Sequence, residues 1–280
     1  MVTVWMLAAI CLSWDVPQEL SRSPVHAGYE WVLDRHPLKR AGARWNTPAK
    51  RVEIKRRERQ AAGSAWSSQE QSLSTSYAIT IARARIEAAT AEISDLYVAG
   101  VHDNGTVVIE RWRFSYPALG QPGGGGGYVP LANRPMPVVT RSVLYMASPG
   151  IGPIRALEVD PQNRFLLLIS HGDSTLFRLD VPSPHQLTPI LNVGQQPQLA
   201  DVRSILYRKH PTEGPKYVLS ELIYWKHAQS LDRVANSKTL LLSDPNDDGT
   251  FDSTELLTRS EWSNRGYHLS ESWEHDRTQW

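Results

Sequence analysis

A run of oxygen-bearing side chains near the end of the chain has the spacing of a metal-binding loop. It extends from Asp244 to Glu255, with oxygen-bearing side chains at positions 1, 3, 5, 9 and 12 of the run. Ca²⁺ takes about six to eight oxygen ligands, and a single short loop can supply them at this spacing. Position 6 is Gly249, which permits a sharp turn that a Cβ would resist. The pattern therefore predicts a calcium site.

The predicted ligands differ in how they would contribute. The side chains of Asp244, Asn246 and Asp248 would point inward, and Thr250 would contribute its backbone carbonyl. Asp252 would bind directly or through water, and Glu255 would give two oxygens. This is the pattern of an EF-hand loop, but the entering segment Lys238–Ser243 is short, apolar and predicts a strand. The exiting segment Thr254–Arg259 fits a strand or a helix. We expect an EF-hand-like loop between strands, and the alternative is an acidic turn that binds no metal.

Length and composition set broad limits. The chain has 280 residues, enough for one large domain or two small ones, with 41% hydrophobic and 21% charged residues. The net charge of +1 argues against electrostatic binding of nucleic acid by the whole molecule. Cys11 is the single cysteine, so no intramolecular disulfide can form.

Residues 1–27 are interpreted as a possible signal or apolar N-terminal segment. Val2–Trp14 is apolar except for Thr3 and Ser13, which is too short to span a bilayer. It is similar to the apolar region of a secretory signal, and Val25-His26-Ala27 has the small residues of a cleavage site, although the usual positive charges before it are missing. We expect no transmembrane span and a secreted, periplasmic or cell-surface location. A cytoplasmic location, with a misplaced or truncated start, is the alternative.

Residues 28–76 are expected to form a poorly ordered basic arm and a linker. The tract from Asp34 to Arg59 contains ten basic residues: Arg35, Lys39, Arg40, Arg44, Lys50, Arg51, Lys55, Arg56, Arg57 and Arg59. Such a tract can contact phosphates or anionic lipid. It contains no recognised nucleic-acid motif, so a solvated arm is the preferred interpretation. Ala61–Ser76 is rich in Ser, Gln and Ala and is interpreted as linker.

Residues 77–260 predict an all-β domain. Leu96–Val101 and Thr106–Phe114 flank Asn104-Gly105, the strongest short hairpin signal. Short apolar runs continue along the chain, and they group into three units of four strands with the spacing of propeller blades. The runs are Tyr77–Ile86, Leu96–Val101, Thr106–Phe114, Pro137–Met146, Ile154–Val159, Arg164–Ser170, Ser174–Val181, Leu187–Val193, Val202–Tyr207, Lys216–Tyr224, Lys238–Ser243 and Ser253–Thr258. Residues 261–280 are expected to be a polar, Trp-containing tail.

Two of these segments resemble a blade of the lactonase and surface-layer β-propellers. They are Asp160–Ser170, with its Asp-Pro-Gln-Asn-Arg-Phe-Leu sequence, and Ser174–Asp180, which ends Arg-Leu-Asp. The resemblance covers about residues 77–259 and implies a β-propeller-like array of four-stranded units. Closed propellers have at least about four blades, so three units imply a fragment, strands borrowed from the N-terminal part, or an open array. Enzymes of that group use acidic and basic residues in the central channel, and no matching set is found here.

Other candidate groups give weaker indications of chemistry. The turns hold His102, Asp103, His171 and Asp173, which could converge on one face but are also ordinary turn formers. Candidate channel carboxylates are Glu158, Asp201, Glu221 and Asp232, with no spacing that pairs an acid with a base. No histidine spacing predicts zinc, and Gly-x-Ser-x-Gly is absent.

These observations favour an exported, calcium-binding, propeller-like interaction protein whose calcium is structural and whose partner is a protein or carbohydrate. One alternative is a propeller hydrolase of the lactonase type or a sugar dehydrogenase. A second is nucleic-acid contact through the basic arm, which the net charge disfavours.

Overall fold

The computed structural model describes twelve stretches of the chain. They are residues 18–22, 30–34, 50–58, 67–87, 92–117, 134–148, 151–170, 175–192, 204–210, 214–220, 238–251 and 253–258. Every helix or strand assigned within them is a strand, so the described part of the protein is all-β, as predicted. Across these stretches, no helix is long and apolar enough to cross a membrane.

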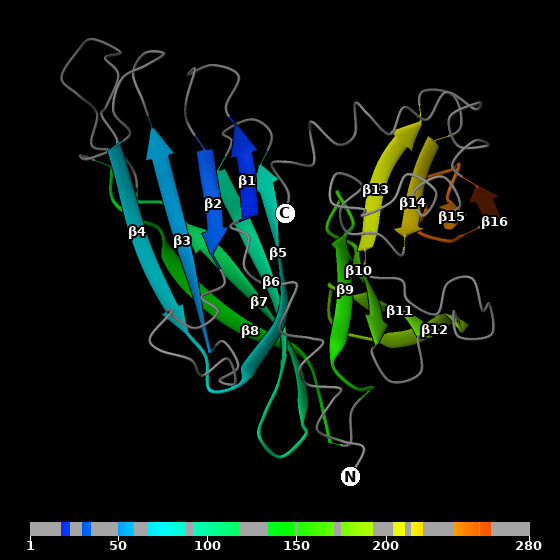
Figure 1. The fold of residues 1–280 in the computed structure, drawn as a ribbon, viewed down its shortest axis with the longest axis horizontal. Helices are drawn as coiled ribbons and strands as arrows, with labels where there is room; N and C mark the ends of the chain where they lie inside the picture. Colours follow the sequence, from blue (N-terminus) through cyan, green and yellow to red (C-terminus); the bar gives the residue numbers. More distant parts are fainter. Residues whose placement is uncertain are drawn as a thin grey trace, which may run out of the picture. The chain divides into compact units, whose positions relative to one another are not determined.

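The strands form four sheets of four strands each (Figure 1). The first sheet contains β1 (Gln18–Arg22), β2 (Glu30–Asp34), β3 (Arg51–Glu58) and β4 (Ser67–Ser74). The second contains β5 (Ala78–Glu87), β6 (Glu92–Val101), β7 (Val107–Ser115) and β8 (Val138–Ala147). The third contains β9 (Ile154–Val159), β10 (Phe165–Ser170), β11 (Thr175–Asp180) and β12 (Leu187–Asn192). The fourth contains β13 (Ser204–His210), β14 (Gly214–Ser220), β15 (Lys238–Ser243) and β16 (Ser253–Thr258). In each sheet the spatial order follows the sequence, which gives the propeller-like array of four-stranded units.

Local sequence explains the hairpins. The β6–β7 turn has Gly105 at φ 84°, where glycine meets no Cβ penalty. The Gly105 N–H donates to the His102 carbonyl at 2.9 Å, and the Thr106 N–H donates to Asn104 Oδ1 at 3.0 Å. The hairpin predicted from Asn104-Gly105 is therefore confirmed.

By its internal contacts the chain divides into two compact units. Unit 1 contains Met1–Val98, Arg111–Ser142 and Trp273–Trp280, and unit 2 contains Ala99–Glu110 and Val143–Ser272. The division passes through β6, β7 and β8 of the second sheet. Within unit 2, the first strands of its two complete sheets, β9 and β13, lie close together.

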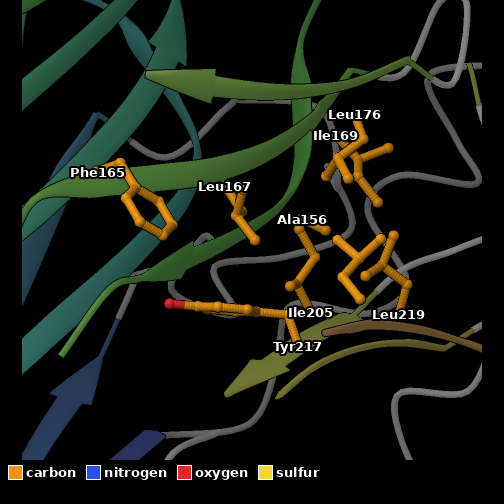
Figure 2. Packing of buried hydrophobic residues seen from close by; sticks show 9 residues of the cluster. Ala156, Phe165, Leu167, Ile169, Leu176, Ile205, Tyr217 and Leu219 are labelled. Carbon is orange, nitrogen blue, oxygen red and sulfur yellow. The ribbon is translucent and has the colours of Figure 1, made fainter. Parts of the chain in front are cut away.

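An apolar core joins the third and fourth sheets. All six residues of β10 are buried, which identifies it as a strand covered on both faces. Phe165, Leu167 and Ile169 of β10 belong to one cluster with Tyr217 and Leu219 of β14 (Figure 2). The Phe165 and Tyr217 rings lie with their centroids 5.9 Å apart, a separation favourable for aromatic pairs. Burial of these apolar faces favours contact between the two sheets.

The structure differs from the sequence-based expectation in the N-terminal part. Strands β3 and β4 lie in the stretch expected to be a basic arm and linker, and they complete a fourth four-stranded unit. Val52, Ile54 and Arg56 alternate inward along β3 and are all buried. Because the third inward position is a charged residue, the two-residue period was not recognised as a strand.

We expect Leu167→Ala to lower the free energy of unfolding by about 2–5 kcal/mol, because it leaves a cavity in a fully buried cluster. Met146→Ala is a control of similar size, since Met146 is 55% exposed; it should cost under about 1 kcal/mol. Urea unfolding of both variants measures the difference. Similar losses in the two would show that the Leu167 cluster is not a tight core.

Candidate calcium loop

The connection between β15 and β16 contains the predicted calcium loop. The strand predicted before the loop is confirmed as β15, and the segment after it is the strand β16 rather than a helix. The loop begins with a turn in which the Asp247 N–H donates to the Asp244 carbonyl at 3.2 Å. Asp247 has φ 55° and Gly249 has φ 86°, so two left-handed residues reverse the chain within three positions. The predicted sharp turn at Gly249 is therefore present.

Asp244 organises the loop from its centre. Its carboxylate is fully buried and accepts the Asp248 N–H at 3.0 Å and the Gly249 N–H at 2.8 Å. Asp248 is exposed, and its carboxylate accepts the Thr250 N–H at 2.7 Å and the Asn246 side-chain amide at 2.9 Å. The first three predicted ligands thus lie in one short turn, each within the hydrogen-bond pattern of the same loop.

The remaining predicted ligands are described incompletely. Asp252 lies outside the described residues, and Glu255 is described only by its backbone, which is paired with Leu241 in the β15–β16 ladder. Among the residues that the structure describes, no group of three or more His, Cys, Asp and Glu side chains is arranged to hold a metal. Calcium binding therefore stays a prediction.

An arginine from the third sheet binds this loop, which sequence reasoning did not anticipate. Arg164 Nη2 donates to Asp160 Oδ1 and to Asp247 Oδ1, both at 2.8 Å. Arg164 Nη1 also donates to the Asp247 carbonyl. We call the group of Asp160, Arg164 and Asp247 the arginine bridge. Gln162 supports it, because its side-chain amide donates to Asp247 Oδ2 at 2.8 Å.

A second set of contacts holds the middle of the loop, at Gly249 and Phe251. Arg178 donates through Nη1 to the Gly249 carbonyl, and its guanidinium lies 4.5 Å from the Phe165 ring centroid. Phe251 packs against the same ring, with the centroids 6.1 Å apart in an edge-to-face arrangement. A Cβ at Gly249 would lie 3.0 Å from Phe165 Cε1, so glycine is required by packing as well as by φ.

The loop repeats a turn found one sheet earlier. Asp160-Pro161-Gln162-Asn163 closes with the Asn163 N–H donating to the Asp160 carbonyl at 2.8 Å, and Asn163 has φ 62°. The Asp160 carboxylate then accepts the Arg164 N–H four residues on, as Asp244 accepts that of Asp248. Both turns begin with Asp-Pro, a shared dipeptide from which the likeness of the two turns could have been predicted. They differ at the fifth residue, which is a cation in one turn and an anion in the other.

Asp160 and Tyr217 are a hydrogen-bonded pair whose surroundings change the pKa of both groups. Burial alone would raise the pKa of its carboxyl, but hydrogen bonds from Arg164 and the Tyr217 hydroxyl, the latter at 3.0 Å, outweigh burial and hold the pKa below its ordinary value. Burial, followed by the Asp160 carboxylate, raises the pKa of Tyr217 far above its usual range. Tyr217 therefore stays a neutral donor at all ordinary pH values.

The other sequence candidates that the structure describes, His102, Asp103 and Glu158, do not belong to this loop. His102 and Asp103 are turn residues of the β6–β7 hairpin, and Glu158 is buried on β9. Two candidate turn residues and three candidate channel carboxylates lie outside the described residues: His171, Asp173, Asp201, Glu221 and Asp232.

The described basic residues of the N-terminal tract take part in strand β3. Arg51 pairs with Glu53 at 3.1 Å, and Lys55 pairs with Glu70. Arg56 is only 1% exposed. These three side chains thus have partners within the protein, which leaves less free positive charge than the sequence suggested.

Gly249→Ala should destabilise the protein more than Gly105→Ala. Both glycines have positive φ, so both substitutions introduce backbone strain of about 1–2 kcal/mol. Only at Gly249 does the new methyl meet a close neighbour, whereas nothing lies within 4 Å at Gly105. We expect an additional loss of about 1–3 kcal/mol for Gly249→Ala in urea unfolding. Equal losses would show that the loop does not pack against Phe165.

Asp160 should make the protein less stable in acid. The pKa of Asp160 in the folded protein is below the unfolded value of about 3.9. Its contribution to the free energy of unfolding is therefore complete above about pH 5 and is lost as pH falls through the folded pKa. Asp160→Asn should lower stability at pH 7 by about 1.5–3 kcal/mol and flatten the decline toward acid.

Unfolding midpoints measured from pH 7 down to pH 3 test this expectation. Asp103→Asn, at an exposed turn residue, is the matched control and should keep the wild-type pH dependence. An unchanged acid slope in Asp160→Asn would contradict the assignment.

Comparisons with known proteins give no family for this chain. No family model matches it, and no curated protein matches it. Among solved structures, it is similar to the crystal structure of the Chaetomium thermophilum Sqt1 bound to the N-terminus of the ribosomal protein L10, with 13% sequence identity and a TM-score of 0.39. The similarity covers 85% of this chain and 59% of that chain, so this chain spans less than two thirds of that protein's length.

Proposed function

We propose that this chain is a calcium-stabilised, propeller-like binding protein in which Ca²⁺ fixes the β15–β16 connection. The observation that carries the proposal is the acid-rich loop between two strands, with oxygen donors at positions 1, 3 and 5 held in one turn around Asp244. Hard oxygen donors of this kind suit Ca²⁺.

The charges of the loop support the same proposal. Asp244, Asp247 and Asp248 lie within five residues, and Arg164 is bonded to Asp247. Asp244 and Asp248 accept N–H groups of the loop itself, which satisfy hydrogen bonding but bring no full positive charge. A divalent cation would supply that charge and lower the mutual repulsion of the carboxylates. Asp252 and Glu255 would complete its ligands.

The proposed role of the metal is structural. A cation in this loop would order the connection between two strands and leave the turns at the ends of the sheets free to bind a protein or carbohydrate partner. The chain would act outside the cytoplasm, where single loops with dissociation constants of about 10⁻⁴–10⁻³ M are occupied. The apolar run Val2–Trp14 supports this location.

Calcium should raise the melting temperature of the purified protein. At about 10 mM calcium and a dissociation constant of about 10⁻⁴–10⁻³ M, binding adds about 1.4–2.7 kcal/mol. For a chain of this size, this corresponds to a rise of about 2–5 °C relative to the chelated protein. Thermal unfolding with calcium and with chelator measures it.

The variant that tests the loop is Asp244→Asn, which keeps the shape of the side chain but removes its charge. It should abolish the calcium-dependent rise, and Asp103→Asn should retain it. Magnesium at the same concentration should give a smaller rise, since Mg²⁺ demands octahedral geometry. If calcium leaves the melting temperature of the wild-type protein unchanged, the loop is an acidic turn and the proposal fails.

A further inference from the structure

Apolar burial alone does not specify how two β-sheets stack. The hydrophobic effect is non-directional, so a cluster such as that of Phe165, Leu167 and Tyr217 favours contact without selecting one arrangement. Hydrogen bonds between charged groups are directional and select an arrangement by geometry. Two buried or half-buried arginines of this protein make such bonds from one sheet to the next.

The first is Arg164, immediately before β10 of the third sheet. Within its own sheet it is bonded to Asp160, through Nε at 3.0 Å and Nη2 at 2.8 Å. Towards the fourth sheet it is bonded to both the carboxylate and the carbonyl of Asp247. Asp160 in turn accepts the hydroxyl of Tyr217, which lies on β14 of the fourth sheet. Hydrogen bonds are therefore donated from the third sheet to the fourth, by Arg164, and from the fourth sheet to the third, by Tyr217.

The second is Arg56, on β3 of the first sheet. Its side chain is 1% exposed, and Nη2 donates to Gln69 Oε1 of β4 at 2.8 Å. The same nitrogen donates to the carbonyls of Arg134 and Pro135 at 3.3 Å, just before β8 of the second sheet. Nη1 donates to Glu92 Oε1 at 3.4 Å, at the start of β6. Gln69 adds a parallel contact, because its amide donates to the Arg134 carbonyl at 2.8 Å.

We propose that these arginines determine the stacking of consecutive sheets, so that each stacked pair opens as one cooperative unit. Arg164 joins the third sheet to the fourth, and Arg56 joins the first sheet to the second. Arginine suits this role because its planar guanidinium presents five donors at fixed angles, so it can bond its own sheet and the neighbouring sheet together. Lysine keeps the charge but loses that geometry.

Cooperative opening of a stacked pair depends on the interface between its two sheets. In an array of stacked units, stability is the sum of each unit's own stability and the interface terms between neighbours. When an interface term is weakened, the less stable sheet can open before its neighbour. If the arginine only added general stability, loss of its contact would instead lower the protection of both sheets against amide hydrogen exchange to the same extent.

Amide hydrogen exchange of the full chain, read peptide by peptide with chelator present, tests this statement. In the wild-type protein, peptides of β10 and β14 should show the same opening equilibrium. In Asp247→Asn, which cuts the charge contact to the fourth sheet and leaves Arg164 bonded to Asp160, exchange in β14 and β15 should become at least about tenfold faster than in β10 and β11. Asn tolerates the left-handed φ of 55° at this position, so backbone strain is not added.

Arg164→Lys is the second variant and should give the same separation of the two sheets. The matched control is Arg113→Met, which removes an arginine that is 60% exposed and 3.8 Å from Asp95; it should leave exchange in β10 and β14 unchanged. Separate opening of the third and fourth sheets already in the wild-type protein would overturn the proposal. An equal acceleration of both sheets in Asp247→Asn and Arg164→Lys would also overturn it.

Arg56→Lys tests the first pair of sheets independently. Exchange in β3 and β4 should become at least about tenfold faster than in β6 and β7. Arg51→Lys, at a neighbouring position whose ion pair with Glu53 lies at the surface, should leave both pairs of strands as in the wild-type protein. Equal acceleration in all four strands of Arg56→Lys would contradict the proposed role of Arg56.

Discussion

The buried carboxylate of Asp160 determines the arrangement of the charged groups in the second unit, because a carboxylate removed from water must be given donors and a positive charge. Arg164 supplies the charge, and the Tyr217 hydroxyl supplies a further donor from the neighbouring sheet. The other donors of the Arg164 guanidinium then reach Asp247. The position of the β15–β16 connection thus follows from the hydrogen-bonding requirement of one carboxylate on the preceding sheet.

The predicted calcium loop is consequently an integrated part of the sheet stack. Arg164 binds it at Asp247 and Arg178 binds it at Gly249, while Phe165 packs against both Gly249 and Phe251. These contacts hold the loop backbone in a turn before any ligand is considered. A loop that is already formed loses less conformational entropy when it binds an ion, which is the physical basis for considering calcium there. The same contacts would transmit ordering of the loop to the third sheet.

Much of the fold could be predicted because its strands carry local signals. The apolar runs of β6, β7, β10 and β11, and the Asn104-Gly105 turn, lie where periodicity and turn chemistry indicated. The first sheet was missed for a specific reason. Strand β3 places Arg56 at an inward position and β4 is made mostly of Ser and Gln, so neither strand has the alternating apolar pattern. The polar inward residues Arg56 and Gln69 are stabilised by hydrogen bonds to the second sheet and to the segment before β8. The sequence of one strand does not show which residues of another sheet will bond to it.

Three features follow from residues that are close together in the chain: the all-β class, the four-residue turns that begin with Asp-Pro, and the spacing of oxygen donors from Asp244 to Glu255. Packing in three dimensions sets which sheets stack, and with them the partners that Arg56, Arg164 and Arg178 find outside their own sheets. Arg164 and Asp247 are 83 residues apart, and nothing in their local sequences connects them. The physical reason is that strand period and turn type are set by neighbouring residues, whereas a buried charge takes its partners from whichever sheet is packed against it.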